Sequence, residues 1–421
     1  MASTSIREAA AEILACCLGG EPVSDELLER VLGPATGADA GAAAEASRAL
    51  FRDVAEALAD RFEPALCNTY ADLFSRVIAF CEPAFRADEL LSRYDRIRTP
   101  KRFQGDGRVV REVFVLSRVT LGADVAITSI ILDAAKKRFP GAEIYFAGSR
   151  KAWELFAGDA RIQHVEAGYR RGGPLRECLA VGLGLRGLLS RPGAIVIDPD
   201  SRLTQLGLLP VCPEQSYYFF ESRAYGGDGI DSLSRLTKRW VAETFGVVDA
   251  LPYIAPAGAV PGPDGAEITV SFGVGENPRK RIAGPFEAEL LRELLERGLR
   301  VVVDKGAGGE EAERVERAIG QLGSKAGRIE TWDGAFAPFA ARIARSRLYV
   351  GYDSAGQHVA AAAKVPLVSV FAGFPSPRFL ARWRPEAPSP VAVIRAEAGS
   401  TPEAILKRTV NSIDRLLKIP C

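Results

Sequence analysis

Net charge is nearly absent from this sequence: 54 basic and 53 acidic residues leave a formal charge of +1 over 421 residues. That balance argues against a protein whose whole surface binds nucleic acid. No apolar stretch reaches the roughly 18 residues that a membrane span requires, because Arg, Asp or Gly interrupts each one. Glu8 and Glu12 lie in the apolar start of the chain, which has no basic beginning, so we expect no signal peptide.

The sequence also lacks any cysteine pair with the spacing of a metal or redox motif. The seven cysteines are scattered and none forms a Cys-x-x-Cys, so the sequence predicts neither a zinc knuckle nor a disulfide framework. A reducing, cytoplasmic location fits best. What is present, 47% apolar and 25% charged residues, is the composition of a globular protein with two or three domains.

The first part of the chain, residues 1–105, is predicted to be all helical. Residues 5–18, 25–32, 42–60 and 70–80 carry apolar side chains at three- and four-residue spacing, separated by Gly and Pro. The low-complexity stretch 37–44 is expected to be a loop or a frayed helix start.

From residue 106 onward, short apolar strands alternate with helices, which is the pattern of a parallel sheet with crossover helices. Strands are expected at 109–119, 142–148, 162–167 and 194–198, and helices at 122–138, 150–157, 174–190 and 230–245. The segment 251–265 holds four prolines and reads as an interdomain linker.

The alternation then restarts in a second domain, residues 266–421. Strands are expected at 268–275, 299–304, 328–332, 347–353 and 366–373, and helices at 285–298, 309–322, 336–346, 354–364 and 401–418. For the last helix, 401–418, two placements are open: it packs in the second domain, or it crosses back to the first. The sequence therefore predicts an α/β protein of two Rossmann-like, doubly wound domains, 106–250 and 266–421, with a ligand cleft between them.

Three strand-to-helix turns carry polar clusters, and helix N-terminal amides at such turns favour anions. The first turn, residues 117–124, ends in Asp124. This Asp fits two interpretations: a residue that complements the helix N-terminus, or a general base that accepts a proton from a hydroxyl.

The second turn, residues 272–281, combines Gly273 and Gly275 with the basic residues Arg279, Lys280 and Arg281. Glycines allow the backbone to approach a ligand closely, so the turn indicates a diphosphate site, with a solvated basic loop as the alternative. It matches neither the Walker A nor the Gly-x-Gly-x-x-Gly pattern.

The third turn, residues 351–358, brings Asp353, Ser354, Gly356 and His358 into the first turns of one helix. A lone histidine in a helix is usually structural, but here it shares the turn with three other polar or small residues that face the predicted cleft. The only other histidine, His164, lies in a strand and is interpreted as structural.

Two further patterns are weaker. Asp198-Pro-Asp200 matches the Asp-x-Asp that binds a metal in some sugar transferases, but nothing nearby supplies more oxygen ligands, so we expect no metal. The glycine-rich turn at 304–311 could bind a base or ribose, or could be a plain strand-to-helix connection.

These three turns, in this order, resemble glycosyltransferase family 9, the bacterial lipopolysaccharide heptosyltransferases of the GT-B fold. Residues 118–124 are similar to the family's Arg-x-x-x-Leu-Gly-Asp turn, Lys280 corresponds to its second-domain lysine, and residues 353–362 resemble Asp-Ser-Gly-x-x-His-x-Ala-x-Ala. The resemblance covers roughly residues 110–418. It departs from the family pattern at the inserted Ala123, at Ala355 in place of a glycine, and at Ile282 in place of an aromatic residue.

The resemblance implies an inverting sugar transfer without a metal or another cofactor, from a nucleoside-diphosphate sugar, with ADP-heptose the donor used in the family. Asp124 would be the base. The donor would be held by a set of residues in the second domain: Gly275, Glu276, Lys280, Glu310 or Glu311, Asp353, Ser354, Gly356 and His358.

The acceptor, a glycan, a lipid-linked sugar or a protein, would meet Arg118 and Arg202, near Asp200 and Ser201. Lipid-anchored acceptors would place the protein at the inner face of the membrane. No nucleic-acid partner is expected.

Two other functions stay open. The insertion at Ala123 motivates a catalytically degenerate nucleotide-sugar-binding or scaffold protein, whose helical region recruits a partner or forms a homo-oligomer. A nucleotide-sugar epimerase of the same fold is the third hypothesis, although it would need further acid–base groups on the sugar.

Overall fold

The computed structural model describes residues 2–37, 39–168, 173–258, 267–275, 277–306 and 308–418. The chain divides into two compact units. The first unit comprises Met1–Thr120, Ile131–Ala152 and Arg161–Ala250, and the second comprises Leu121–Ile130, Trp153–Ala160 and Leu251–Cys421.

The predicted N-terminal helices are present. They are α1 (Ala2–Gly19), α2 (Asp25–Thr36), α3 (Ala40–Arg48), the π-helical η1 (Ala49–Glu56), α4 (Ala57–Ala59), α5 (Pro64–Cys81) and α6 (Ala87–Ile97). Ser24 caps α2 through Leu27 N at 3.2 Å, and Asp39 caps α3, so the stretch from Ala40 on is helix rather than loop. The sequence pattern did not predict α6.

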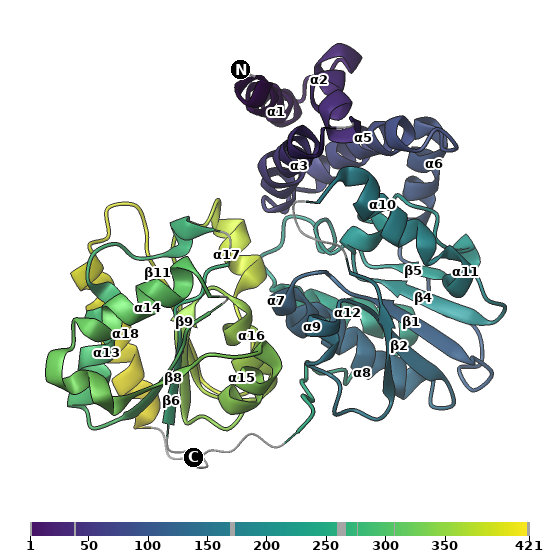
Figure 1. Ribbon diagram of the computed structural model, residues 1–421. Helices are drawn as coiled ribbons and strands as arrows, with labels where there is room; N and C mark the ends of the chain where they lie inside the picture. The colour runs from purple at the N-terminus through teal and green to yellow at the C-terminus, as the bar shows by residue number, and fades with distance from the viewer. Residues whose placement is uncertain are drawn as a thin grey trace. The chain divides into compact units, whose positions relative to one another are not determined.

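The first sheet is fully parallel, in the order β3-β2-β1-β4-β5 (Figure 1). Its strands are β1 (Glu112–Leu116), β2 (Glu143–Gly148), β3 (Ile162–Glu166), β4 (Ala194–Asp198) and β5 (Tyr217–Phe219). Phe114 in the central strand pairs with Tyr145 of β2 and with Val196 of β4. The three-residue edge strand β5 was not predicted, because strands this short carry no alternation that a pattern could detect.

The elements that connect these strands begin and end as follows: α7 (Leu121–Ala123), the π-helical η2 (Asp124–Thr128), α8 (Ser129–Arg138), α9 (Arg150–Trp153), α10 (Leu175–Gly184), α11 (Arg186–Leu189), η3 (Arg202–Thr204), η4 (Glu214–Ser216) and α12 (Leu233–Phe245). The helix expected at 174–190 is therefore split at Leu185, and the helix expected at 150–157 is a single turn. Glycine-rich sequence around the split lowers helix propensity, which explains the first difference.

One hydrophobic core joins the helical region to the first sheet. Ile13, Phe74 and Tyr94 of the helices belong to the same buried cluster as Phe114 and Leu116 of β1. The side chain of Ser47 also accepts a hydrogen bond from Leu175 N at 2.9 Å, at the start of α10. The helical residues and the first Rossmann-like sheet are thus packed as one body rather than as two separate cores.

The second sheet is also parallel, in the order β11-β10-β9-β6-β7-β8. Its strands are β6 (Glu267–Ser271), β7 (Arg300–Asp304), β8 (Ile329–Trp332), β9 (Leu348–Tyr352), β10 (Leu367–Phe371) and β11 (Val391–Arg395). Its helices are η5 (Pro278–Lys280), α13 (Phe286–Glu296), α14 (Glu310–Gly320), η6 (Gly323–Arg328), α15 (Phe336–Ile343), α16 (Ala355–Ala362), α17 (Pro377–Trp383) and α18 (Pro402–Leu417). The pattern missed α17 and β11. Of the predicted linker, residues 251–258 are described and the remainder lies outside the described residues.

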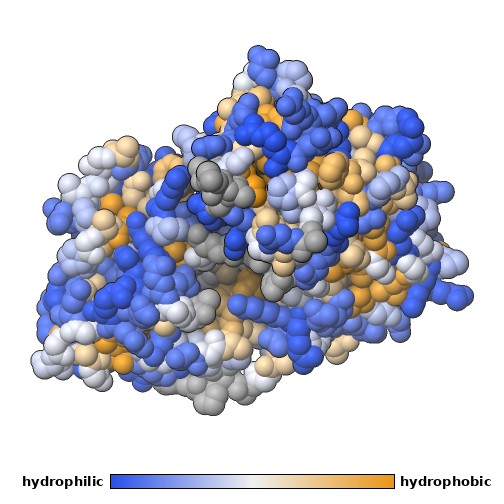
Figure 2. Space-filling model, turned by 45° about the horizontal axis from the view of Figure 1, so that its top comes forward, coloured by the Kyte–Doolittle hydropathy of each residue, from blue (hydrophilic) through white to orange (hydrophobic). Residues whose placement is uncertain are grey.

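The face of the molecule drawn in Figure 2 is mostly hydrophilic. Figure 2 shows hydrophilic side chains over most of the visible face, with apolar ones gathered on the right of the view, over the first unit. No helix within the described residues combines the length and apolar character needed to cross a bilayer.

Close packing of α10 on the turn after β4 gives a stability test. A Cβ on Gly182 would lie 2.1 Å from the Leu203 carbonyl oxygen, whereas one on Gly184 would meet nothing within 4 Å. We expect Gly182→Ala to destabilise the first unit by about 1–3 kcal/mol through overpacking, and Gly184→Ala to be neutral or stabilising by up to about 1 kcal/mol. Urea unfolding of the two variants checks this; equal midpoints would contradict the packing described.

Candidate functional site

The turn after β6 forms an anion-binding loop. Val274 N and Gly275 N both donate to the Glu311 Oε1 carboxylate oxygen, at 2.9 and 3.2 Å. Gly275 has φ +61°, a left-handed conformation that glycine adopts without strain. Successive amides that converge on one oxygen are the geometry with which a backbone holds an anion. The sequence pattern gave no sign that a carboxylate from α14 fills this loop, and its role as a diphosphate site stays a prediction.

Lys280 is joined to the turn after β9. Its Nζ lies 2.7 Å from Asp353 Oδ2 and 3.2 Å from the Asp353 carbonyl oxygen. Asn277 positions η5 by accepting a hydrogen bond from Arg279 N at 3.1 Å. The Lys280 ammonium also lies 5.6 Å from the centre of the Phe379 ring. A half-buried cation therefore lies beside the turn that precedes α16, and its contact with a donor stays a prediction.

The first turn of α16 carries a buried polar network. Gln357 Nε2 donates to Asp353 Oδ1 at 2.6 Å, and Ser369 Oγ donates to Gln357 Oε1 at 2.5 Å. Gln357 Nε2 also lies 3.3 Å from His358 Nε2. Burial lowers the pKa of His358 to about 4, so the imidazole is neutral at physiological pH. A neutral His358 can act as a hydrogen-bonding partner but brings no positive charge to an anion.

Two residues of this turn have different local roles. Ser354 is the N-cap of α16 by position, but its side chain makes no capping hydrogen bond. A Cβ on Gly356 would lie 2.2 Å from the hydroxyl oxygen of Tyr349, which is fully buried beneath it. The glycine at 356 rather than 355 is thus required by the Tyr349 side chain, a contact within the protein itself.

Glu310, another predicted donor residue, is exposed and pairs with Arg281 at 2.6 Å. Glu276 lies outside the described residues. Of the two adjacent glutamates, it is Glu311 that reaches the anion-binding loop.

Asp124 lies inside a π-helical turn. It is fully buried, and its Oδ1 accepts a hydrogen bond from Thr128 Oγ1 at 2.8 Å. It begins η2, directly after α7, and both belong to the second unit with α16. A Cβ on Gly122 would stand 3.2 Å from His358 Cδ2 and 3.3 Å from Ala355 Cα, so this turn packs against the start of α16.

In the first unit, the ends of three strands meet at Asp200. Its Oδ2 is 3.0 Å from an Arg118 guanidinium nitrogen, 2.5 Å from Arg223 Nη1, and accepts from Ser222 Oγ at 2.9 Å. Arg118 also donates to the carbonyl oxygens of Pro199 and Asp200, at 3.0 and 2.8 Å. Burial lowers the pKa of Arg118 to about 10, which still leaves it charged at neutral pH. Arg118 is therefore turned inward, holding the loop after β4.

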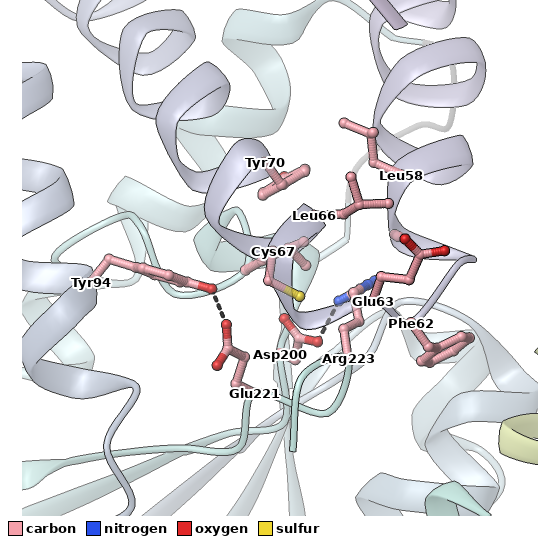
Figure 3. A pocket seen from close by; sticks show the side chains of 12 residues that line it. Leu58, Phe62, Glu63, Leu66, Cys67, Tyr70, Tyr94, Asp200, Glu221 and Arg223 are labelled. Atoms are coloured by element: carbon pink, nitrogen blue, oxygen red, sulfur yellow. Dashed lines mark hydrogen bonds and ion pairs between the residues drawn. The ribbon is translucent and has the colours of Figure 1, made fainter. Parts of the chain in front are cut away.

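Helices α5 and α6 cover this cluster. Figure 3 shows Cys67 and Tyr70 of α5 facing the Asp200–Arg223 pair across a small pocket. The Tyr94 hydroxyl donates to Glu221, and Arg98 Nη2 lies 2.9 Å from the same carboxylate. The helical region thus forms one wall of the site where the first sheet ends.

Three other residues singled out from the sequence, Arg202, Asp198 and His164, make contacts with other groups of the protein. Arg202 Nη1 is half-buried and lies 3.3 Å from the Tyr70 hydroxyl. Asp198 is fully buried, accepts hydrogen bonds from Thr204 and Tyr217, and has its pKa raised to about 6 by burial. His164 bonds the Gly148 carbonyl oxygen at 2.9 Å. Within the described residues, no group of three or more His, Cys, Asp or Glu is placed to hold a metal.

Residues 285–404 match the model of glycosyltransferase family 9 (heptosyltransferase). The match covers less than half of the chain and lies within its second unit, so it shows that this segment is similar to the family. The resemblance drawn from the three turns is confirmed, and the matched segment is that of a glycosyltransferase. The segment includes Asp353, His358 and Glu311, while Lys280 lies just before its first matched residue. Among curated proteins, none matches this chain.

Solved structures support the same fold. A family 9 glycosyltransferase of Veillonella parvula aligns with a TM-score of 0.57 and 17% identity, over 74% of this chain and 98% of that one. An ADP-heptose lipopolysaccharide heptosyltransferase II of Escherichia coli gives 0.52 and 19%, over 73% and 98%. The E. coli heptosyltransferase WaaC with ADP gives 0.52 and 16%, over 73% and 99%. The predicted GT-B fold is therefore confirmed.

The segment that matches family 9 also holds two functional candidates that the sequence pattern missed or left undecided. Gln357 is four residues after Asp353, but Asp353 precedes the N-cap Ser354, so helix periodicity alone did not pair their side chains. Glu311 could not be chosen over Glu310 without the fold, because the carboxylate reaches a loop 36 residues earlier in the chain.

The neutral imidazole of His358 gives a pH prediction. Its pKa is about 4 in the folded protein against about 6.5 unfolded, so the unfolded chain binds more protons between these values. The contribution to the free energy of unfolding is therefore complete above about pH 6.5 and falls by roughly 3 kcal/mol as the pH drops to 4. Histidine NMR on a chain with two histidines, assigned with His358→Gln, should show His358 unprotonated at pH 5.5; titration near 6.5 would contradict the buried environment.

Proposed function

We propose that this protein transfers a sugar, heptose-like and carried on ADP, from its nucleoside diphosphate to an acceptor hydroxyl, with inversion and without a metal. The observation that carries the proposal is the anion-binding loop of Val274 and Gly275 beside Lys280, in a chain with a segment that matches family 9. The Glu311 carboxylate occupies these amides as a diphosphate oxygen would.

The chemistry requires two things from the protein. As the acceptor oxygen bonds to the anomeric carbon, the bond from that carbon to the donor phosphate breaks, and the departing diphosphate gains negative charge. Lys280 and the two loop amides supply fixed positive charge and donors for it. The acceptor's proton passes to the Asp124 carboxylate as general base.

In this proposal the residues around the donor have different roles. When a diphosphate oxygen takes the loop amides, the Glu311 carboxylate is released toward the nucleoside. Asp353 holds Lys280 in place at 2.7 Å, and Gln357 holds Asp353 at 2.6 Å. ADP is the nucleotide bound in one E. coli heptosyltransferase of similar fold. The acceptor, a glycan, lipid-linked or protein hydroxyl, would be met by the first unit, at the cytoplasmic face of a membrane if it is lipid-linked.

Nucleotide binding tests the donor site. With EDTA present, we expect ADP to raise the thermal stability more than GDP, UDP or CDP, by about 2.7 kcal/mol when ADP is at 100 times its Kd. Lys280→Met should weaken ADP binding at least tenfold, because it removes the charge next to the loop amides. Lys407→Met, an exposed lysine on α18, is the matched control. Equal ADP affinity in both variants would remove Lys280 from the donor site.

The rate of sugar transfer tests the role of Asp124 as general base. We expect Asp124→Asn to keep ADP binding within about twofold and to lower the transfer rate by 10²–10⁴, the usual contribution of a general base. Thr128→Val removes the hydrogen-bonding hydroxyl and should lower the rate far less. Unchanged transfer in Asp124→Asn would exclude the assigned role. ADP binding by a wild-type protein that transfers nothing from ADP sugars would favour the degenerate binding protein.

A further inference from the structure

The segment that carries Lys280 has little regular structure of its own. Residues 277–282, which we call the Lys280 segment, are all described and contain a single 3₁₀ turn, η5. Within it, Lys280 N donates to the Asn277 carbonyl oxygen and Arg281 N to that of Pro278, both at 3.2 Å. Because 3₁₀ hydrogen bonds have poor geometry, one such turn does not fix its own position. The place of Lys280 therefore depends on what holds the segment from outside.

Ile282, at the end of the Lys280 segment, is anchored through both of its backbone polar groups. Its amide nitrogen donates to the Tyr352 hydroxyl oxygen at 3.2 Å, and its carbonyl oxygen accepts from Arg314 Nη2 at 3.2 Å. A buried backbone group without a partner costs free energy, so the Ile282 amide depends on the side chain that reaches it. Side chains from β9 and α14 thus supply the partners that a strand or helix would otherwise provide.

Glu287 of α13 contacts both of these side chains. Arg314 Nε lies 2.8 Å from each of its carboxylate oxygens, and the Tyr352 hydroxyl donates to Oε1 at 3.1 Å. The residue is buried, with 4% of its surface exposed, so water does not compete for these charge-assisted bonds. A hydroxyl has one proton, and its donation to Glu287 leaves the oxygen lone pairs of Tyr352 to accept the Ile282 amide. The carboxylate therefore directs the hydroxyl as well as the guanidinium.

The same strand end holds Lys280 directly. Asp353 follows Tyr352 in the chain, and its Oδ2 lies 2.7 Å from Lys280 Nζ. Two neighbouring residues thus bind the Lys280 segment at two points, one through a backbone amide and one through the ammonium group. Because Ile282 is only two residues from Lys280, a displacement of one moves the other.

We propose that Glu287 is a positioning residue of the donor site, which fixes the place of Lys280 by directing Tyr352 and Arg314 onto the backbone of Ile282. This inference rests on the proposed function, because it explains why Lys280 stays where a diphosphate needs it. A positive group stabilises developing charge best when its position is set in advance. Glu287 contributes through other residues and contacts no substrate.

Amide hydrogen exchange, followed by mass spectrometry, tests whether Glu287 anchors the segment. We expect Glu287→Gln and Tyr352→Phe each to speed exchange in the peptide 277–284 by about tenfold or more, because the Ile282 amide loses a directed acceptor. Exchange in α18 should stay at the wild-type rate, as a sign that the second unit remains folded. Wild-type exchange of 277–284 in both variants would overturn the anchoring. Tyr352→Phe removes only one oxygen atom, so it decides alone if Glu287→Gln does not fold.

Glu267 offers a matched control in the same unit. It is also a buried carboxylate, 3% exposed, and it pairs with one arginine, Arg342, at 2.9 and 3.1 Å. Glu267 is the first residue of β6, whereas the Lys280 segment follows the last residue of that strand. Glu267→Gln should therefore lower the thermal stability, as Glu287→Gln does, but leave both the exchange of 277–284 and the ADP affinity unchanged. An equal loss of ADP affinity in the two variants would overturn the positioning role.

ADP binding in the presence of EDTA tests whether Glu287 acts through Lys280. Glu287→Gln should weaken ADP binding about tenfold in the wild-type background but less than about twofold in a Lys280→Met background, where the positioned group is already gone. An equal loss in both backgrounds would overturn the assignment. A wild-type protein that binds no ADP would instead contradict the proposed donor site and, with it, the positioning role, while the exchange of 277–284 still decides whether Glu287 anchors the segment.

Discussion

The ends of three strands in the first unit are joined by one buried carboxylate, that of Asp200. Arg118 follows β1, Asp200 follows β4, and Ser222 and Arg223 follow β5, so their contacts at 2.5–3.0 Å tie three strand ends to one oxygen atom. Asp200 adopts a left-handed φ of +69°, which costs free energy in a residue with a side chain. The two arginines offset that cost, and loss of the Asp200 carboxylate would leave their buried charges uncompensated, at about 3–5 kcal/mol.

This cluster also determines what the helical region does. Tyr94 and Arg98 bind Glu221, which lies two residues from Arg223, and α5 covers Asp200 from the other side. Because the helices share a hydrophobic core with β1 and β4, they are an integral wall of the first unit. Any ligand that reaches the carboxyl ends of these strands therefore meets residues of the helical region as well as of the Rossmann-like sheet.

Much of this architecture could be predicted from the sequence, because parallel strands buried on both faces leave long β-branched runs between amphipathic helices. The Lys280 and Asp353 turns were found for the same reason: polar residues there directly follow such runs. The contact of Glu311 with the Gly275 amide could not be found, since no local pattern reports which carboxylate crosses from one loop to another.

The π-helical turn η2 lies directly after Ala123, the residue that the family resemblance marks as an insertion. One extra residue in an α-helix would rotate everything after it by about 100° and turn its apolar face out of the core. A π-helix has a wider turn, which has room for one additional residue. Ile127, Ile130 and Ile131, which follow Ala123, are all fully buried. The backbone around Asp124 therefore departs from a regular α-helix while the packing of α8 is intact, which separates the question of catalysis from that of the fold.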